Sequence, residues 1–112
     1  MLFVYGTLLD PEVLARVSGE PALARRLRGA RLEGWRRVFL RGTPYPTLVP
    51  QRGAVVQGAV LRAGDAALAR LSAYEGSAYV LTPLGVSTAR GALRAHAWIA
   101  PPWRADPRRD WP

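Results

Sequence analysis

The sequence predicts an α+β fold with a curled β-sheet that is mostly antiparallel or mixed. Several strand-like runs are separated by short helical patterns, and glycines inside two of these runs favour kinks or bulges. The chain has 112 residues and is 49% hydrophobic, which fits one compact domain over residues 1–112. No internal repeat divides it.

The N-terminal segment predicts a buried strand, a turn and a short helix. The apolar run at 2–5 stops at Gly6, as a buried strand entering a turn does. Asp10 has the side chain of an N-cap, and Gly19 lies where a helix over 12–17 would end.

The next segments predict strands that are interrupted by proline and glycine. Residues 21–28 fit either a helical turn or an irregular approach to a strand. Apolar residues over 30–40 indicate a strand with a kink at Gly34. The two prolines in 42–46 make that segment a loop, because proline lacks the N–H that a paired strand donates. A short strand is expected at 47–49.

A turn, a central strand and a second helix are expected in the middle of the chain. A proline and a glycine favour a turn over 50–53, and alternation over 54–61 indicates a strand with Gly58 as its bulge. Asp65 is placed to cap a helix over 66–71 whose leucines face inward.

The last third of the chain predicts two further strands and a packed tail. The segment 79–86 is strand-like, and Pro83 makes it an edge strand or a bulged one. The alternation over 93–99 indicates the last strand. The tail at 101–112 is rich in Pro, Arg and Trp, and its two tryptophans favour packing against the body.

Composition excludes several classes of chemistry. The chain has no Cys, so disulfides and thiol catalysis are excluded, and its 16 basic residues are all Arg, so neither a Schiff-base lysine nor a Walker A lysine exists. The single His, His96, lies within a strand pattern and is interpreted as a strand residue rather than a member of a catalytic triad. The sequence predicts no metal site and no cofactor.

The formal net charge of +8 can indicate a nucleic-acid partner. The arginines are scattered, however, and no RNA-binding signature accompanies them, so we interpret the charge as composition and expect no specific nucleic acid. No apolar stretch approaches the length of a membrane span, and the N-terminal run is too short for a signal peptide. We expect a cytoplasmic protein without a membrane partner that is a monomer or a weak homodimer.

One carboxylate stands apart from the other acidic residues. Glu75 ends a short helical pattern among apolar and aromatic residues, and Gly76 follows at once. A carboxylate among apolar groups keeps its proton to higher pH than a free one, which suits general acid/base catalysis. The alternative is a Glu that ends a helix with its charge in water, and the local pattern leaves both open.

Four blocks of sequence resemble the γ-glutamylcyclotransferase-like family, and most closely its AIG2-like branch, which includes γ-glutamylamine cyclotransferases. The blocks are 3–8, 42–47, 58–61 and 71–79, and together they span the chain up to about Ala100. The resemblance implies a small barrel-like mixed sheet with short flanking helices and a cavity at one end. Family members often have an Arg directly after the Tyr of the last block, where this chain has Val80.

The resemblance also implies roles for individual residues. Such enzymes convert a γ-glutamyl amide into 5-oxoproline and a free amine. Glu75 would be the proton acceptor, and the other implied residues are a substrate-binding loop of Tyr5, Gly6, Thr7 and Leu8 and a cavity wall at Tyr79.

The same reaction suits the residues on chemical grounds. The α-amine of the substrate attacks its own γ-carbonyl, so the protein supplies no nucleophile. One carboxylate can accept a proton and return it, and a Gly-containing loop after a buried strand can aim successive N–H groups at an anion. Two functions stay open: a cyclotransferase, and a non-catalytic small-molecule or protein-binding module that keeps the fold.

Overall fold

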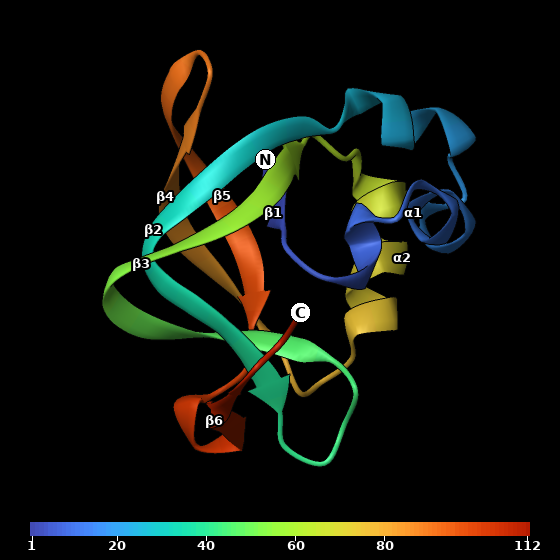
Figure 1. The fold of residues 1–112 in the computed structure, drawn as a ribbon. Helices are drawn as coiled ribbons and strands as arrows, with labels where there is room; N and C mark the ends of the chain where they lie inside the picture. Colours follow the sequence, from blue (N-terminus) through green and yellow to red (C-terminus); the bar gives the residue numbers. More distant parts are fainter.

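The computed structural model describes residues 1–112, and its strands form one sheet that is flanked by short helices (Figure 1). None of the helices is long and apolar enough to cross a membrane. In chain order the elements are β1 (Leu2–Val4), η1 (Thr7–Leu9), α1 (Pro11–Ser18), η2 (Pro21–Arg26), β2 (Arg28–Leu40), β3 (Pro46–Leu61), α2 (Asp65–Glu75), β4 (Val80–Thr88), β5 (Gly91–Ile99), η3 (Pro102–Arg104) and β6 (Ala105–Asp110).

Strands β1 to β5 close into a small barrel. The strand order is β3-β1-β5-β4-β2-β6, and an additional pairing of β3 with β2 closes the ring and leaves β6 outside it. Strands β1 and β5 are parallel, with Leu2 opposite His96, and all other pairs are antiparallel. The predicted α+β class and the barrel-like mixed sheet are confirmed.

Strand β1 separates two hydrophobic clusters, because successive side chains of a strand point to opposite faces of a sheet. Phe3 and Tyr5 belong to the cluster inside the barrel. Leu2 and Val4 belong to the cluster that packs against α1, η2 and α2, which cover one side of the barrel (Figure 1). The chain therefore leaves the barrel at Gly6 with the Tyr5 side chain inside.

The two α-helices begin in different ways. The Asp10 side chain accepts a hydrogen bond from the Glu12 N–H at 2.9 Å, and Gly19 ends α1 with φ at +74°, so the predicted signals of α1 are confirmed. In α2 the prediction is wrong: Gly64 is the N-cap, and Asp65 is the first helical residue and makes no cap hydrogen bond. Its negative charge still suits the N-terminal turn of the helix dipole. Residues 21–28, which fitted either a helical turn or an irregular approach to a strand, contain the 3₁₀ helix η2.

Strands β2 and β3 bend together at an irregular point of their ladder. The predicted turn at 50–53 is wrong, because β3 continues through it and pairs with β2 on both sides. The register shifts between Glu33 and Trp35, and Gly34 and Gly53 both have φ at +83° there. The predicted kink at Gly34 is therefore confirmed. The segment 50–53, which was expected to be a turn, is a bulge within β3.

Two other irregularities have separate causes. Gly58 is not a bulge, because it pairs with Ala30 in regular register. A Cβ at this position would collide with the Val4 carbonyl oxygen and lie 2.7 Å from the Phe3 ring, so β3 needs a glycine where it runs beside β1. Pro83 lies where β4 pairs with β5 only, since β2 reaches β4 only near Thr88. The missing N–H of Pro83 thus faces an open edge, as predicted.

The C-terminal tail packs against the barrel through β6 (Figure 1) and through hydrogen bonds of Trp111. The Trp111 N–H donates to the Arg37 carbonyl at 3.1 Å, and its Nε1 donates to the Pro44 carbonyl at 2.9 Å. Trp103 does not follow the prediction: it is 70% exposed, and its ring contacts the guanidinium of Arg104. One of the two tail tryptophans therefore holds the tail in place.

Candidate active site

A cavity of about 130 Å³ lies where η1, the start of β3 and the end of α2 meet. All residues predicted for the site line it, so the structure brings the N-terminal loop and Glu75 together although they are far apart in sequence. The complete wall consists of Phe3, Val4, Tyr5, Gly6, Thr7, Leu8, Tyr45, Pro46, Tyr74, Glu75, Tyr79 and Trp98.

The loop at 5–8 lines this cavity and has backbone N–H groups without a partner in its own turn. The first hydrogen bond within the 3₁₀ turn η1 runs from the Leu9 N–H to the Gly6 carbonyl at 3.0 Å. The N–H groups of Thr7 and Leu8, which precede it, therefore have no acceptor within this turn. A Cβ on Gly6 would lie 2.7 Å from Cγ of Pro46. A glycine therefore allows the loop to lie against the rigid proline ring.

Glu75 is the last residue of α2, and Gly76 ends the helix with φ at +81°. Its side chain is half-buried on the cavity wall, and no ion pair of the protein involves its carboxylate. Burial raises the pKa of Glu75 from 4.5 to about 7, and the C-terminus of a helix also disfavours a negative charge. At neutral pH both protonation states are populated, which is the condition for accepting and returning a proton.

Two tyrosines near Glu75 have hydroxyls that are committed to backbone carbonyls. The Tyr5 hydroxyl donates to the Trp98 carbonyl, and the Tyr79 hydroxyl donates to the Pro46 carbonyl at 2.7 Å. Burial raises the pKa of both phenols, and the nearby negative charge of Glu75 raises them further. Both therefore stay neutral. Tyr79 lines the cavity and ties the segment between α2 and β4 to Pro46 at the start of β3.

Two further tyrosines at the mouth of the cavity were not predicted for the site. Tyr45 is 48% exposed and Tyr74 is 40% exposed, and both line the wall. The hydroxyls of Tyr74 and Thr7 lie 3.1 Å apart and share a hydrogen bond, which links α2 to the loop. Tyr74 directly precedes Glu75, and that position could have indicated it; the sequence around Tyr45 indicates only a loop.

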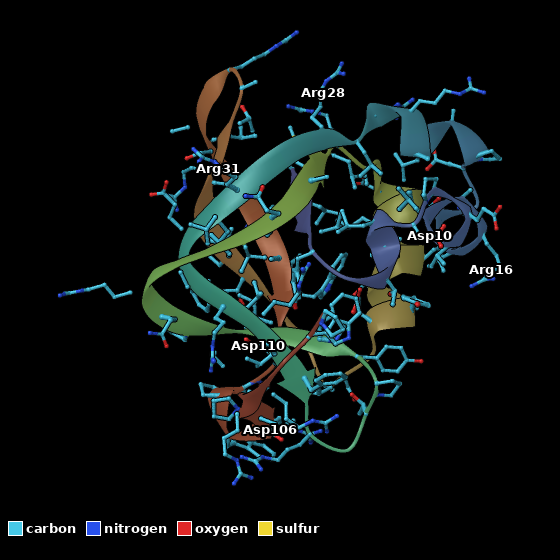
Figure 2. All side chains as sticks on the ribbon, viewed as in Figure 1. Asp10, Arg16, Arg28, Arg31, Asp106 and Asp110 are labelled. Atoms are coloured by element: carbon cyan, nitrogen blue, oxygen red, sulfur yellow. The ribbon has the colours of Figure 1, made fainter.

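Glu75 is the only charged side chain in the cavity wall. No three His, Cys, Asp or Glu side chains gather in a cluster that could hold a metal ion. The labelled Arg28 and Arg31 project from the first half of β2, and Asp106 and Asp110 lie on β6, away from α2 (Figure 2). The cavity wall thus contains no guanidinium.

Residues 2–112 match the protein family described as gamma-glutamyl cyclotransferase, AIG2-like. AIG2-like protein A of Arabidopsis thaliana is 31% identical to this chain, over 95% of the chain and 64% of that protein. Protein AIG2 C of the same plant is 30% identical, over 96% and 64%. The chain thus spans less than two thirds of the length of these relatives.

Solved structures show the same fold. Two solution structures of Arabidopsis thaliana proteins superpose with TM-scores of 0.77 and 0.75 at 28% and 27% identity; each covers 96% of this chain, and the matches span 65% and 72% of those chains. A gamma-glutamyl cyclotransferase superposes with a TM-score of 0.74 over 89% of this chain and 65% of its own, at 20% identity. At that identity the likeness bears on the fold alone.

Proposed function

This chain belongs to the AIG2-like gamma-glutamyl cyclotransferase family, and on that premise we propose that it converts a γ-glutamyl amide into 5-oxoproline and a free amine. One observation carries the proposal. A half-buried carboxyl group with a pKa of about 7 shares a small cavity with a loop whose backbone N–H groups have no acceptor inside their own turn.

The proposed reaction is an intramolecular acyl transfer. The Glu75 carboxylate accepts a proton from the α-ammonium group of the substrate, and the resulting amine attacks the γ-carbonyl carbon. The new C–N bond closes a five-membered ring. Glu75 then returns its proton to the nitrogen of the leaving amine, and the original C–N bond breaks. The ring nitrogen releases its extra proton, which the free amine takes up as it becomes an ammonium ion, so that the lactam product is neutral. No water is consumed, and nothing is oxidised or reduced.

The loop would hold the anionic part of the substrate. Backbone N–H groups at Thr7 and Leu8 are donors of the kind that stabilise a carboxylate or a developing oxyanion. The cavity of about 130 Å³ is smaller than the roughly 300–1,000 Å³ of drug-sized sites, which fits a γ-glutamyl group. The amine portion would then leave past Tyr45 and Tyr74, the exposed residues of the wall.

We propose that the protein acts as a monomer or a weak homodimer in a neutral environment. A carboxyl group with a pKa of about 7 exchanges protons most effectively near neutral pH, which suits the cytoplasm, the location that we propose.

The test is release of 5-oxoproline from γ-glutamyl amines and γ-glutamyl dipeptides, measured by chromatography together with the free amine. We expect the parent to release both in equal amounts, and Glu75→Gln to lose about 10²-fold to 10⁴-fold in turnover because proton transfer is removed. A protein that binds 5-oxoproline but releases none from any compound would instead be a non-catalytic binding module.

A further inference from the structure

Arg37 of β2 reaches the loop from behind the cavity wall. Its Nη1 donates to the Tyr5 carbonyl oxygen at 2.6 Å, a hydrogen bond with a charged donor. Arg37 is not part of the wall, and its Nε is buried without a partner. The guanidinium thus makes one defined contact with the loop and none with the cavity.

The Tyr5 carbonyl and the Gly6 N–H belong to the same peptide group. All peptide bonds of the chain are trans, and a planar trans peptide points its N–H opposite to its C=O. With the carbonyl held by Arg37, the Gly6 N–H points away from Arg37. A positive charge at the carbonyl oxygen also polarises the peptide, which makes its N–H a stronger donor.

Trp111 holds Arg37 in this position. The guanidinium carbon lies 5.2 Å from the centre of the Trp111 ring, and the Trp111 N–H bonds to the Arg37 carbonyl. The ring nitrogen of Trp111 donates to the carbonyl of Pro44, two residues before Pro46, which packs against Gly6. The tail thus supports the loop through Arg37 and through the segment that leads to Pro46.

We propose that Arg37, held by Trp111, is a positioning residue that presets the Gly6 N–H as a donor to the anionic group of the ligand. The proposal rests on the proposed function, in which the loop binds the γ-glutamyl group, or the 5-oxoproline product, through its backbone. It makes the C-terminal tail a part of the site, since the tail supplies Trp111. Arg37 itself contacts neither the ligand nor the reacting atoms.

The first experiment measures the affinity for 5-oxoproline by calorimetry in Arg37→Met, which keeps an unbranched stem and removes the guanidinium. Arg70→Met is the matched control, because Arg70 Nη1 also donates to a backbone carbonyl, that of Ser18 at 3.1 Å, outside the cavity wall. The affinity should fall about 10-fold to 100-fold in Arg37→Met and change less than about threefold in Arg70→Met. Arg37→Lys keeps the charge and should recover part of the loss.

The second readout is the Gly6 amide proton in the NMR spectrum without ligand. Its resonance should move upfield in Arg37→Met and in Trp111→Ala, lie between these and the parent in Trp111→Phe, and stay in place in Arg70→Met. Trp111→Ala carries the test if Arg37→Met does not fold. An unmoved Gly6 resonance together with unchanged affinity would overturn the proposal.

The two proposals can fail separately. If the parent neither binds nor releases 5-oxoproline, the proposed function is wrong. The Gly6 resonance is then the only readout that shows whether Arg37 fixes the orientation of the Tyr5–Gly6 peptide group. If the parent is active but Arg37→Met loses stability without any change in 5-oxoproline affinity or in the Gly6 resonance, the function stands and the positioning role is refuted.

Discussion

Replacing Glu75 with Gln should stabilise the protein at neutral pH while it removes most turnover. Gln has nearly the same shape as Glu but no charge. The ionised carboxylate of Glu75 is half-buried and has no ion-pair partner, so the folded state disfavours the charged form. The pKa rises accordingly from 4.5 to about 7.

The size and the sign of this effect follow from the two pKa values. The difference between 4.5 and about 7 corresponds to at most about 3 kcal/mol of unfolding free energy. Below pH 4.5 the group is protonated in the folded and the unfolded chain, and there is no penalty. Between 4.5 and about 7 only the folded chain keeps the proton, so stability falls as pH rises, and above that range the full penalty is present.

Urea unfolding of the parent and Glu75→Gln across this pH range measures the effect. The two proteins should be equally stable near pH 4, and the variant should be about 1–3 kcal/mol more stable near pH 8. Glu33→Gln is the control. It makes the same change at an exposed position of β2, so its unfolding free energy should depend on pH as that of the parent does. Equal stability of Glu75→Gln and the parent near pH 8 would refute the argument that burial raises this pKa.

Four other outcomes are expected. The kcat/KM of the parent should fall about tenfold per pH unit below the Glu75 pKa of about 7, and a flat pH–rate profile would identify another base. Gly6→Ala should lose about 1–3 kcal/mol of stability, because its Cβ would lie 2.7 Å from the Pro46 ring, and it should also bind 5-oxoproline more weakly. Thermal melts and calorimetry that equal those of the parent would show that the loop tolerates a side chain. Tyr79→Phe should lose about 1–3 kcal/mol of stability, because the Pro46 carbonyl loses its donor at 2.7 Å, but its turnover should stay within about tenfold of the parent. Full inactivation would instead show that the hydroxyl has a chemical role. Binding to duplex DNA should be weak and lost toward physiological salt in a fluorescence titration, and a tight, sequence-selective complex would contradict the interpretation of the charge.

The features that the sequence predicts well are those whose determinants lie in one segment. Asp10 and Gly19 bound α1 through interactions within the helix itself. Two features that depend on a partner strand differ from the prediction. Gly58 has the pattern of a bulge, but the reason for a glycine is the close approach of the Val4 carbonyl and the Phe3 ring on β1. The segment 50–53 has the composition of a turn, but β2 continues to pair on both sides of it.

The residues of the candidate site also differ in whether a local sequence pattern reveals them. Glu75 and the loop at 5–8 could be predicted because each has its own local signal, a carboxylate among apolar residues and a glycine that ends a buried strand. Arg37 is one of 16 arginines, and no local pattern distinguishes it. Its contact with Tyr5 exists because the closed barrel and the tail bring β2, Trp111 and the loop together.

The central claim is that the loop and Glu75 act on one bound ligand, and a crystal structure of the protein with 5-oxoproline tests it most directly. We predict that the carboxylate or the lactam carbonyl of 5-oxoproline accepts hydrogen bonds of about 3 Å from the loop amides. The ring N–H should lie within hydrogen-bond distance of the Glu75 carboxyl group. A ligand bound outside this cavity, or bound in it with Glu75 turned to solvent, would contradict the account.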